Sequence, residues 1–169
     1  MDIAILIWIQ EHMRTDWLTP AIQLINTIGH YGAFWLVLAL VLALHKATRQ
    51  QGILVTSSIL FCGGIAEILK HLVMRPRPFL THPDLLPLGH LPHSFSFPSG
   101  HTVCAFAAAF IFWRTCRNRY GYLALCLAVI MAFSRLYVGV HYPSDVLGGI
   151  VIAALGSFLV WHYRNNLDR

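Results

Sequence analysis

Three short groups of residues in this 169-residue chain combine ionisable side chains with serine and glycine at spacings that suit phosphate chemistry. A guanidinium group forks onto two phosphate oxygens, an ammonium group adds a point charge, and the first N–H groups of a helix face an anion. Glycine at such a helix start lets the backbone come close to the anion. The residues that we predict to bind phosphate, without a metal ion or cofactor, are Lys70, Arg77, Ser99, Gly100 and Arg135.

His141, Asp145 and His101 are the predicted catalytic residues. Because His141 and Asp145 are four residues apart, a helix would place them on one face, where the carboxylate can hold the Nδ1–H of the imidazole. The Nε2 atom of His141 is then free as a nucleophile. The ordinary pKa of histidine, near neutrality, suits His101 to protonate a leaving group and later to activate water. The pattern therefore predicts phosphoryl transfer with two histidines in different roles.

The three groups form an ordered signature: Lys-x6-Arg-Pro from Lys70, Pro-Ser-Gly-His from Pro98, and Ser-Arg-x5-His-x3-Asp from Ser134. This signature resembles that of the type 2 phosphatidic acid phosphatase (PAP2) superfamily, in particular its small bacterial membrane phosphatases. The resemblance implies a metal-independent phosphatase that acts on a lipid phosphate or diphosphate through a phosphohistidine at His141. Family members of this size act on undecaprenyl diphosphate, phosphatidylglycerophosphate, phosphatidate or lipid A phosphates. We expect one of the first two.

Other activities stay open at this point. A lipid phosphotransferase would use the same site, because a lipid acceptor can replace water in the attack on the phosphohistidine. A lipid A phosphatase would carry the same signature. A transporter subunit, with its charges along an ion path, is the non-enzymatic alternative. The convergence of three motifs and the lack of a visible internal repeat argue against a transporter.

The segments that must position these residues are apolar. Hydrophobic residues make up 57% of the chain and charged residues 11%, against about 25% charged in soluble domains. This composition predicts a single all-α domain over residues 1–169, an integral membrane helical bundle whose partners are the bilayer and a lipid phosphate. Nucleic acid is not an expected partner, because the cations lie between apolar segments or inside the motifs. The oligomeric state is open. The five predicted spans are about 25–44, 53–72, 99–113, 122–137 and 146–161.

The first 20 residues contain one apolar run, Ile3 to Ile9. It is too short to cross a bilayer, which needs about 20 residues in a helix. Because polar residues follow at once, we predict an interfacial helix with Trp8 and Trp17 as anchors. A sixth membrane helix, short or tilted, is the alternative.

Lysine and arginine are unequally distributed between the two ends of the predicted bundle. Positive residues mark the cytoplasmic loops of membrane proteins. The sequence therefore predicts a multi-pass protein of the inner (plasma) membrane with its active site facing the periplasm or the exterior. With five spans, the cytoplasmic side carries Lys46, Arg49, Arg114, Arg117, Arg119, Arg164 and Arg169.

The longest connector, about 79–97, contains three prolines and three histidines. Proline spacing argues against a continuous helix there. The segment is either a lid or lipid-facing collar beside the site, or an ordinary packed connector. His82, His90 and His93 fit no standard zinc spacing, so we predict no metal site.

Two charged residues lie beside the first signature group. Glu67 precedes Lys70 by three residues, and the two side chains are predicted to pair on one helix face. Arg75 lies two residues before Arg77 and is predicted to contact a second phosphate, a lipid headgroup or solvent.

Overall fold

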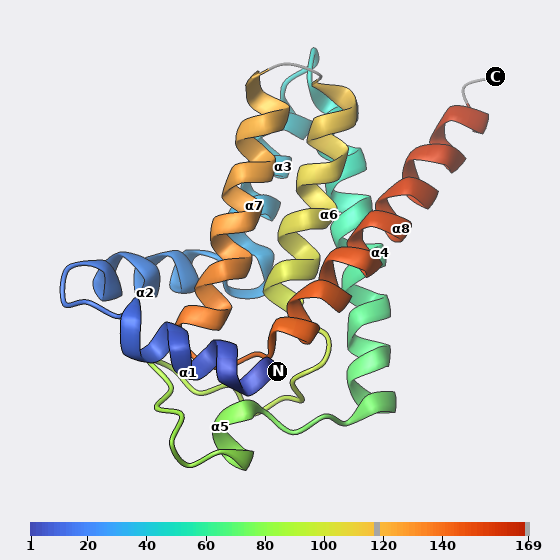
Figure 1. The fold of residues 1–169 in the computed structure, drawn as a ribbon. Coiled ribbons are helices and arrows are strands. Elements are labelled where there is room, and N and C mark those ends of the chain that lie inside the picture. Colours follow the sequence, from blue (N-terminus) through green and yellow to red (C-terminus); the bar gives the residue numbers. More distant parts are fainter. Residues whose placement is uncertain (117–118, 168–169) are drawn as a thin grey trace.

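The computed structural model describes residues 1–116 and 119–167. Within these residues the regular structure is helical and contains no strand, which confirms the all-α fold (Figure 1). Arg117 and Arg169, two of the predicted cytoplasmic cations, lie outside the described residues. In chain order the elements are α1 (Asp2–His12), α2 (Leu18–Ile28), the 3-10 turn η1 (His30–Gly32), α3 (Ala33–Leu44), α4 (Arg49–Val73), α5 (Pro78–Thr81), α6 (Gly100–Thr115), α7 (Arg119–Tyr137) and α8 (Pro143–Leu167).

Five helices, α3, α4, α6, α7 and α8, form the bundle, and α6 lies at its centre (Figure 1). α6 contacts α4, α7 and α8. Small side chains allow this central position, because they let neighbouring helices approach closely. The fully buried alanines of α6 are Ala105, Ala107, Ala108 and Ala109.

Three stretches of the described chain are long and apolar enough to cross a membrane: 49–81, 119–137 and 143–164. They contain three of the five predicted spans, and this confirms a multi-pass helical membrane protein. α2 and α3 would add a fourth span if counted together, although their axes differ by 54°. α6 has 16 residues, which at about 1.5 Å per residue is shorter than a hydrocarbon core of about 30 Å.

The predicted span over residues 25–44 is interrupted and is not one continuous helix. α2 ends at Ile28, and the chain turns through η1 before α3 begins at Ala33. Gly32 enters α3 with φ of 72°, a left-handed conformation that favours glycine, and a methyl group on it would lie 2.9 Å from Cys104 Cβ. Figure 1 shows that α2 lies across the end of the bundle, whereas α3 runs along it. Hydropathy did not reveal this break because the chain is apolar on both sides of it.

The N-terminal segment forms a separate short helix, α1, as predicted. It buries Leu6 and Ile9, while Trp8 and Trp17 are exposed. α1 contacts α7 and α8 and lies with α2 beside the lower end of the bundle (Figure 1). Both helices are therefore placed next to the connectors that carry the signature residues.

The connector after Arg77 contains only the short helix α5 and is otherwise irregular, as its prolines predicted. Arg14 anchors it: Nη1 donates to the carbonyl oxygen of Leu86 at 2.5 Å, and Nε donates to that of Tyr137 at 3.0 Å. The N–H of Leu88 donates to the Val138 carbonyl oxygen at 2.9 Å. These contacts make it a packed connector rather than a free lid.

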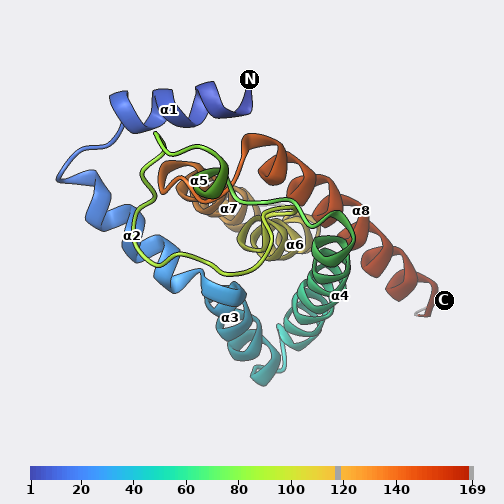
Figure 2. The ribbon, with the colours of Figure 1, turned by 90° about the horizontal axis from the view of Figure 1, so that it is seen from below.

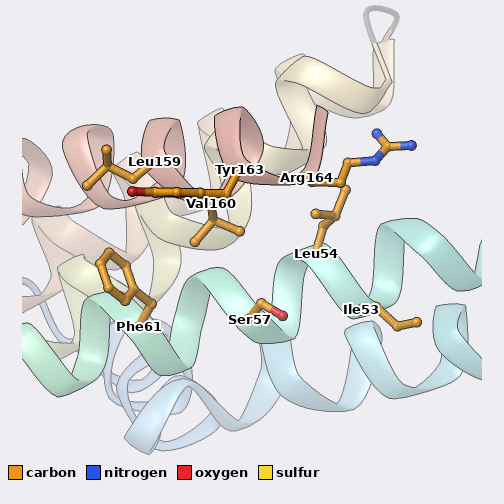
Figure 3. A pocket seen from close by; sticks show the side chains of 8 residues that line it. All are labelled: Ile53, Leu54, Ser57, Phe61, Leu159, Val160, Tyr163 and Arg164. Atoms are coloured by element: carbon orange, nitrogen blue, oxygen red, sulfur yellow. The ribbon is translucent and has the colours of Figure 1, made fainter. Parts of the chain in front are cut away.

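A groove of about 440 Å³ separates α4 from the C-terminal half of α8 (Figure 3). No predicted site residue lines it, because the signature residues of these two helices lie at their opposite ends. The lining residues are Ile53, Leu54, Ser57, Phe61, Leu159, Val160, Tyr163 and Arg164.

Candidate active site

The three signature groups meet at one end of the bundle because each lies at or just beyond the end of a helix. Lys70 is in the last turn of α4, and Gly100 is the first residue of α6. Arg135 is in the last turn of α7, and Asp145 is in the first turn of α8. Figure 2 shows α5 and its connector across this end, with α1 and α2 beside it.

Arg77 is the most extensively bonded of the predicted phosphate ligands. It is 3% exposed, and Nε donates to the Ser94 carbonyl oxygen at 2.7 Å. Nη1 donates to the Val140 carbonyl oxygen at 2.9 Å and to Nε2 of His141 at 3.2 Å. Nη2 donates to Ser94 Oγ and to the Phe95 carbonyl oxygen. The guanidinium group is thus fixed directly beside the predicted nucleophile.

The contact between Arg77 and His141 assigns the tautomer of the imidazole. Arginine has donors only, so Nε2 of His141 must accept with its lone pair, and the ring proton is then on Nδ1. Nδ1 lies 3.5 Å from Oδ2 of Asp145. This is long for a hydrogen bond, and catalytic contacts of this kind often shorten only when substrate binds. Nε2 of His141 is therefore a neutral acceptor, and its lone pair becomes free to attack phosphorus once a phosphate oxygen takes over the Arg77 donor.

His141 is enclosed by protein, with an exposed fraction of 2%. Burial lowers the pKa of His141 to about 3; the charges of Arg135 and Arg77 lower it as well, while Asp145 acts in the opposite direction. A histidine with this pKa is neutral at physiological pH, which is the state that a nucleophile requires.

The carboxylate of Asp145 is fully buried and accepts several hydrogen bonds. Oδ2 accepts from Ser96 Oγ at 2.5 Å and from the N–H of Tyr142 at 2.9 Å. Oδ1 accepts from Nη1 of Arg75 at 2.6 Å. The structure therefore places Arg75 on a site carboxylate, a contact that was not among the predictions for this residue. Sequence reasoning also missed Ser96, which belongs to no signature group.

Lys70 forms the ion pair that its spacing predicted, with Nζ 3.2 Å from Oε2 of Glu67. The same ammonium group lies beside the start of α6, because a methyl group on Gly100 would be 3.6 Å from Nζ. A cation and a helix N-terminus thus face the same space, and both attract an anion.

Ser99 is the residue before α6, as predicted, and it is fully buried. Its N–H donates to the Asp145 carbonyl oxygen at 3.2 Å, and its Oγ accepts from Thr102 Oγ1 at 3.0 Å. The backbone donors that can face an anion therefore begin at Gly100. Close packing fixes this junction, since a methyl group on Gly148 of α8 would lie 2.4 Å from the ring of Phe97.

α2 reaches the site through Asn26, which sequence reasoning missed. Asn26 Oδ1 accepts from Nη1 of Arg135, and its carbonyl oxygen lies 3.4 Å from Nε2 of His101. Asn26 Nδ2 donates to the Ile22 carbonyl oxygen at 2.9 Å, which fixes the direction of the amide. The ring of His30 lies 5.8 Å from that of His101. The sequence did carry one indication of this role, because Asn26 is a polar residue within a largely apolar helix.

The three connector histidines, His82, His90 and His93, do not form a cluster. His90 and His93 have ring centroids 6.4 Å apart, and His82 Nδ1 is bonded to Thr81 Oγ1 at 2.8 Å. Among the residues that the structure describes, no group of three or more His, Cys, Asp or Glu side chains is arranged to hold a metal ion.

Comparison with known proteins identifies the family of this chain. The PAP2 superfamily model matches residues 51–169. A decaprenylphosphoryl-5-phosphoribose phosphatase of Mycobacterium tuberculosis is 34% identical over 159 residues, which are 90% of this chain and 85% of that protein. An undecaprenyl-diphosphatase of Sulfolobus acidocaldarius is 32% identical over 126 residues, 74% of this chain; the match spans only 61% of that longer protein.

A solved structure is similar over almost the whole chain. It is a transmembrane PAP2-type phosphatidylglycerolphosphate phosphatase of Bacillus subtilis, 28% identical, with a TM-score of 0.81. The likeness covers 99% of this chain and 86% of that one, so it includes the N-terminal helices that the family model leaves out.

Proposed function

Because this chain belongs to the PAP2 superfamily of membrane phosphatases, we propose that it hydrolyses an isoprenoid lipid diphosphate through a phosphohistidine at His141. The observation that carries the proposal is the contact of Arg77 Nη1 with Nε2 of His141, which places a fixed guanidinium group where a phosphate would meet the nucleophile. Arg135, Lys70 and the start of α6 supply the remaining positive charge.

The first step forms a bond between Nε2 of His141 and phosphorus and breaks the bond to the leaving oxygen. His101 donates a proton to that oxygen. Asp145 stabilises the positive charge that develops on the imidazole. In the second step, water gives its proton to His101 and attacks phosphorus, the phosphorus–nitrogen bond breaks, and inorganic phosphate leaves. The cationic groups neutralise the equatorial oxygens in both steps.

The choice of an isoprenoid substrate is supported by the names of both relatives described above, each of which acts on a polyprenyl-linked phosphate. Undecaprenyl diphosphate is our first candidate and phosphatidylglycerophosphate the second. Phosphate release from a panel that also holds phosphatidate and lipid A phosphates tests the choice. Fastest release from a glycerolipid would overturn it, and transfer to an added lipid alcohol without phosphate release would indicate a phosphotransferase.

We further propose that Lys70, Arg77 and Arg135 take the part that a divalent cation plays in other phosphoryl transfers. Turnover should survive EDTA, and vanadate should inhibit because its five-coordinate form resembles the transition state. Activity that is lost in chelator and restored by one divalent ion would contradict the proposal.

We propose that the catalytic end faces the periplasm or exterior and that residues 1–169 act as one domain. The α3–α4 junction, the end of α6, the start of α7 and the end of α8 lie at the other end (Figure 1). Among the described residues they carry Lys46, Arg49, Arg114, Arg119 and Arg164, and positive residues of this kind mark cytoplasmic loops. In a Cys126→Ser background, Leu86→Cys should react with an impermeant thiol reagent on intact cells, and Lys46→Cys should not. The reverse pattern would invert the orientation.

A further inference from the structure

We propose that Arg75, held by Asp2 of α1, is a positioning residue that orients the carboxylate of Asp145 toward His141. The inference rests on the nucleophilic role proposed for His141 and goes beyond it. It extends the functional part of the chain to α1, which lies outside the region that the family model matches.

The contacts of Arg75 place its guanidinium group between two carboxylates. Nη1 donates to Asp145 Oδ1 at 2.6 Å and to Ser144 Oγ at 2.8 Å. Nη2 donates to Asp2 Oδ2 at 3.2 Å, and Ser144 Oγ donates to the same Asp2 oxygen. The guanidinium carbon lies 3.8 Å from the ring centroid of Tyr142, which limits rotation of the group.

This geometry determines which oxygen of Asp145 faces the histidine. Arg75 binds Oδ1, while Oδ2 accepts from Ser96 and the Tyr142 N–H and faces Nδ1 of His141. Rotation of the carboxylate would break these bonds together. Arg75 also holds Ser96, because its carbonyl oxygen accepts from the Ser96 N–H at 2.9 Å. That backbone contact survives replacement of the Arg75 side chain.

α1 takes part in the site through the carboxylate of Asp2, which pairs with Arg75. Asp2 and Arg75 are about one-third exposed, so their ion pair alone is weak. Asp2 nevertheless binds Arg75 and Ser144 at once, and it thereby holds Nη2 of the guanidinium group while Nη1 binds Asp145. α1 is held in place by apolar packing of Leu6 and Ile9. Docking of α1 and orientation of the catalytic carboxylate are thus linked.

The test compares four variants of the full chain in detergent. Arg75→Ala should lower kcat roughly 10- to 100-fold, since it removes a bond between charged groups. It should leave KM within about threefold, because Arg75 acts on the Nδ1 side of His141 whereas the proposed phosphate would meet Nε2. Arg75→Lys should keep part of kcat, and guanidinium ion added to Arg75→Ala should restore part of it. Asp2→Asn should lower kcat less, and Glu11→Gln, a carboxylate change on the same helix, should not lower it.

The double variant Asp2→Asn/Arg75→Ala should be no slower than Arg75→Ala, because the effect of Asp2 acts through Arg75. The proposal would be overturned if the kcat losses of the two single variants multiplied in the double variant. It would also be overturned if Arg75→Ala kept its kcat or changed only KM. A loss of kcat without guanidinium rescue would do so too, since it would indicate a merely structural role.

A second measurement does not depend on turnover. The His141 imidazole should be the Nδ1–H tautomer in both proteins, because Arg77 still donates to Nε2. The Nδ1 nitrogen and proton shifts of ¹⁵N-labelled His141 should nevertheless move in Arg75→Ala, because the carboxylate of Asp145 that faces Nδ1 loses its orientation. Identical shifts in both would overturn the positioning role even if no lipid in the panel were a substrate. A wild-type protein that forms no phosphohistidine but shows the shift change would contradict only the proposed function.

Discussion

The N-terminal segment, residues 1–44, and the signature-bearing part, residues 51–169, contribute different kinds of side chain to the site. The signature-bearing part supplies the two histidines, Asp145 and the cations near phosphate. The N-terminal segment supplies Asp2 and Asn26, and each of these contacts an arginine of the site rather than His141. Residues 51–169 therefore hold the groups that react, and residues 1–44 contribute groups that orient the arginines of the site.

This difference implies a gradient of effects. Loss of a reacting group removes a step, whereas loss of an orienting group changes how often the site is correctly arranged. Variants in residues 51–169 should accordingly be more severe than those in residues 1–44, and variants at the contact between the two parts should act on stability.

The largest effect is expected for His141→Ala. It removes the nucleophile, so turnover should fall roughly 10⁴-fold or more, and labelled phosphoenzyme should disappear. His101→Ala should cost roughly 10²- to 10⁴-fold but still form phosphoenzyme from a substrate with a good leaving group such as p-nitrophenyl phosphate. Trapping of acid-labile label in both variants makes the distinction. Label retained in His141→Ala would mean that another residue is the nucleophile.

These reacting groups could be predicted from the sequence because their spacing is local. His141 and Asp145 lie four residues apart. They meet across the turn that enters α8 at Pro143, not on one helix face as predicted, whereas Glu67 and Lys70 lie three apart on α4. The predicted spans 53–72, 122–137 and 146–161 correspond to α4, α7 and α8 for the same reason, since each is a continuous apolar run.

The orienting groups could not be predicted in this way. Asp2 is 73 residues from Arg75, and Asn26 is 109 residues from Arg135. A contact over such a separation depends on how helices pack and leaves no spacing pattern. The break between α2 and α3 was not predicted for a related reason: it depends on the conformation of Gly32 within an apolar stretch.

A change at the contact of the two parts should reduce stability and leave the site residues in place. A methyl group on Gly52 of α4 would lie 2.4 Å from the Ala39 carbonyl oxygen of α3, and backbone atoms cannot move aside. Gly52→Ala should therefore lower the free energy of unfolding by about 1–3 kcal/mol, as measured by unfolding in mixed micelles.

Gly63→Ala is the matched control on the same helix. No described atom lies within 4 Å of the added methyl group, so helix propensity alone should make this variant up to about 1 kcal/mol more stable. Equal stability of the two variants would show that α3 does not pack on α4 as closely as the structure places it.

The buried imidazole should make stability depend on pH. The pKa of His141 is about 3 in the folded protein and about 6.5 when unfolded, so the unfolded state binds more protons between these values. The free energy of unfolding is therefore unaffected by His141 above pH 6.5 and decreases as pH falls toward 3. The decrease is about 2 kcal/mol at pH 5. Unfolding of the wild type and of His141→Asn at pH 7 and pH 5 measures it. An equal pH dependence in both proteins would place the titrating group elsewhere.

The smallest effect is expected for Asn26→Ala in the N-terminal segment. Asn26 Oδ1 holds Nη1 of Arg135, while Nε of Arg135 is buried without a hydrogen-bond partner in the described part of the chain and so can bind phosphate. Without Asn26 the guanidinium group loses its orientation but keeps its charge. KM and the vanadate inhibition constant should therefore rise roughly 10-fold, the effect of one bond to a charged group, with kcat changed less.

Thr27→Ala is the control for this variant, because its hydroxyl bonds only to the Gln23 carbonyl oxygen of its own helix among the contacts described. It should leave both constants unchanged. A kcat loss in Asn26→Ala as large as that of His101→Ala, with KM unaltered, would mean that Asn26 acts on His101 through its carbonyl contact. The N-terminal segment would then take part in proton transfer, and the division between reacting and orienting parts would fail at this residue.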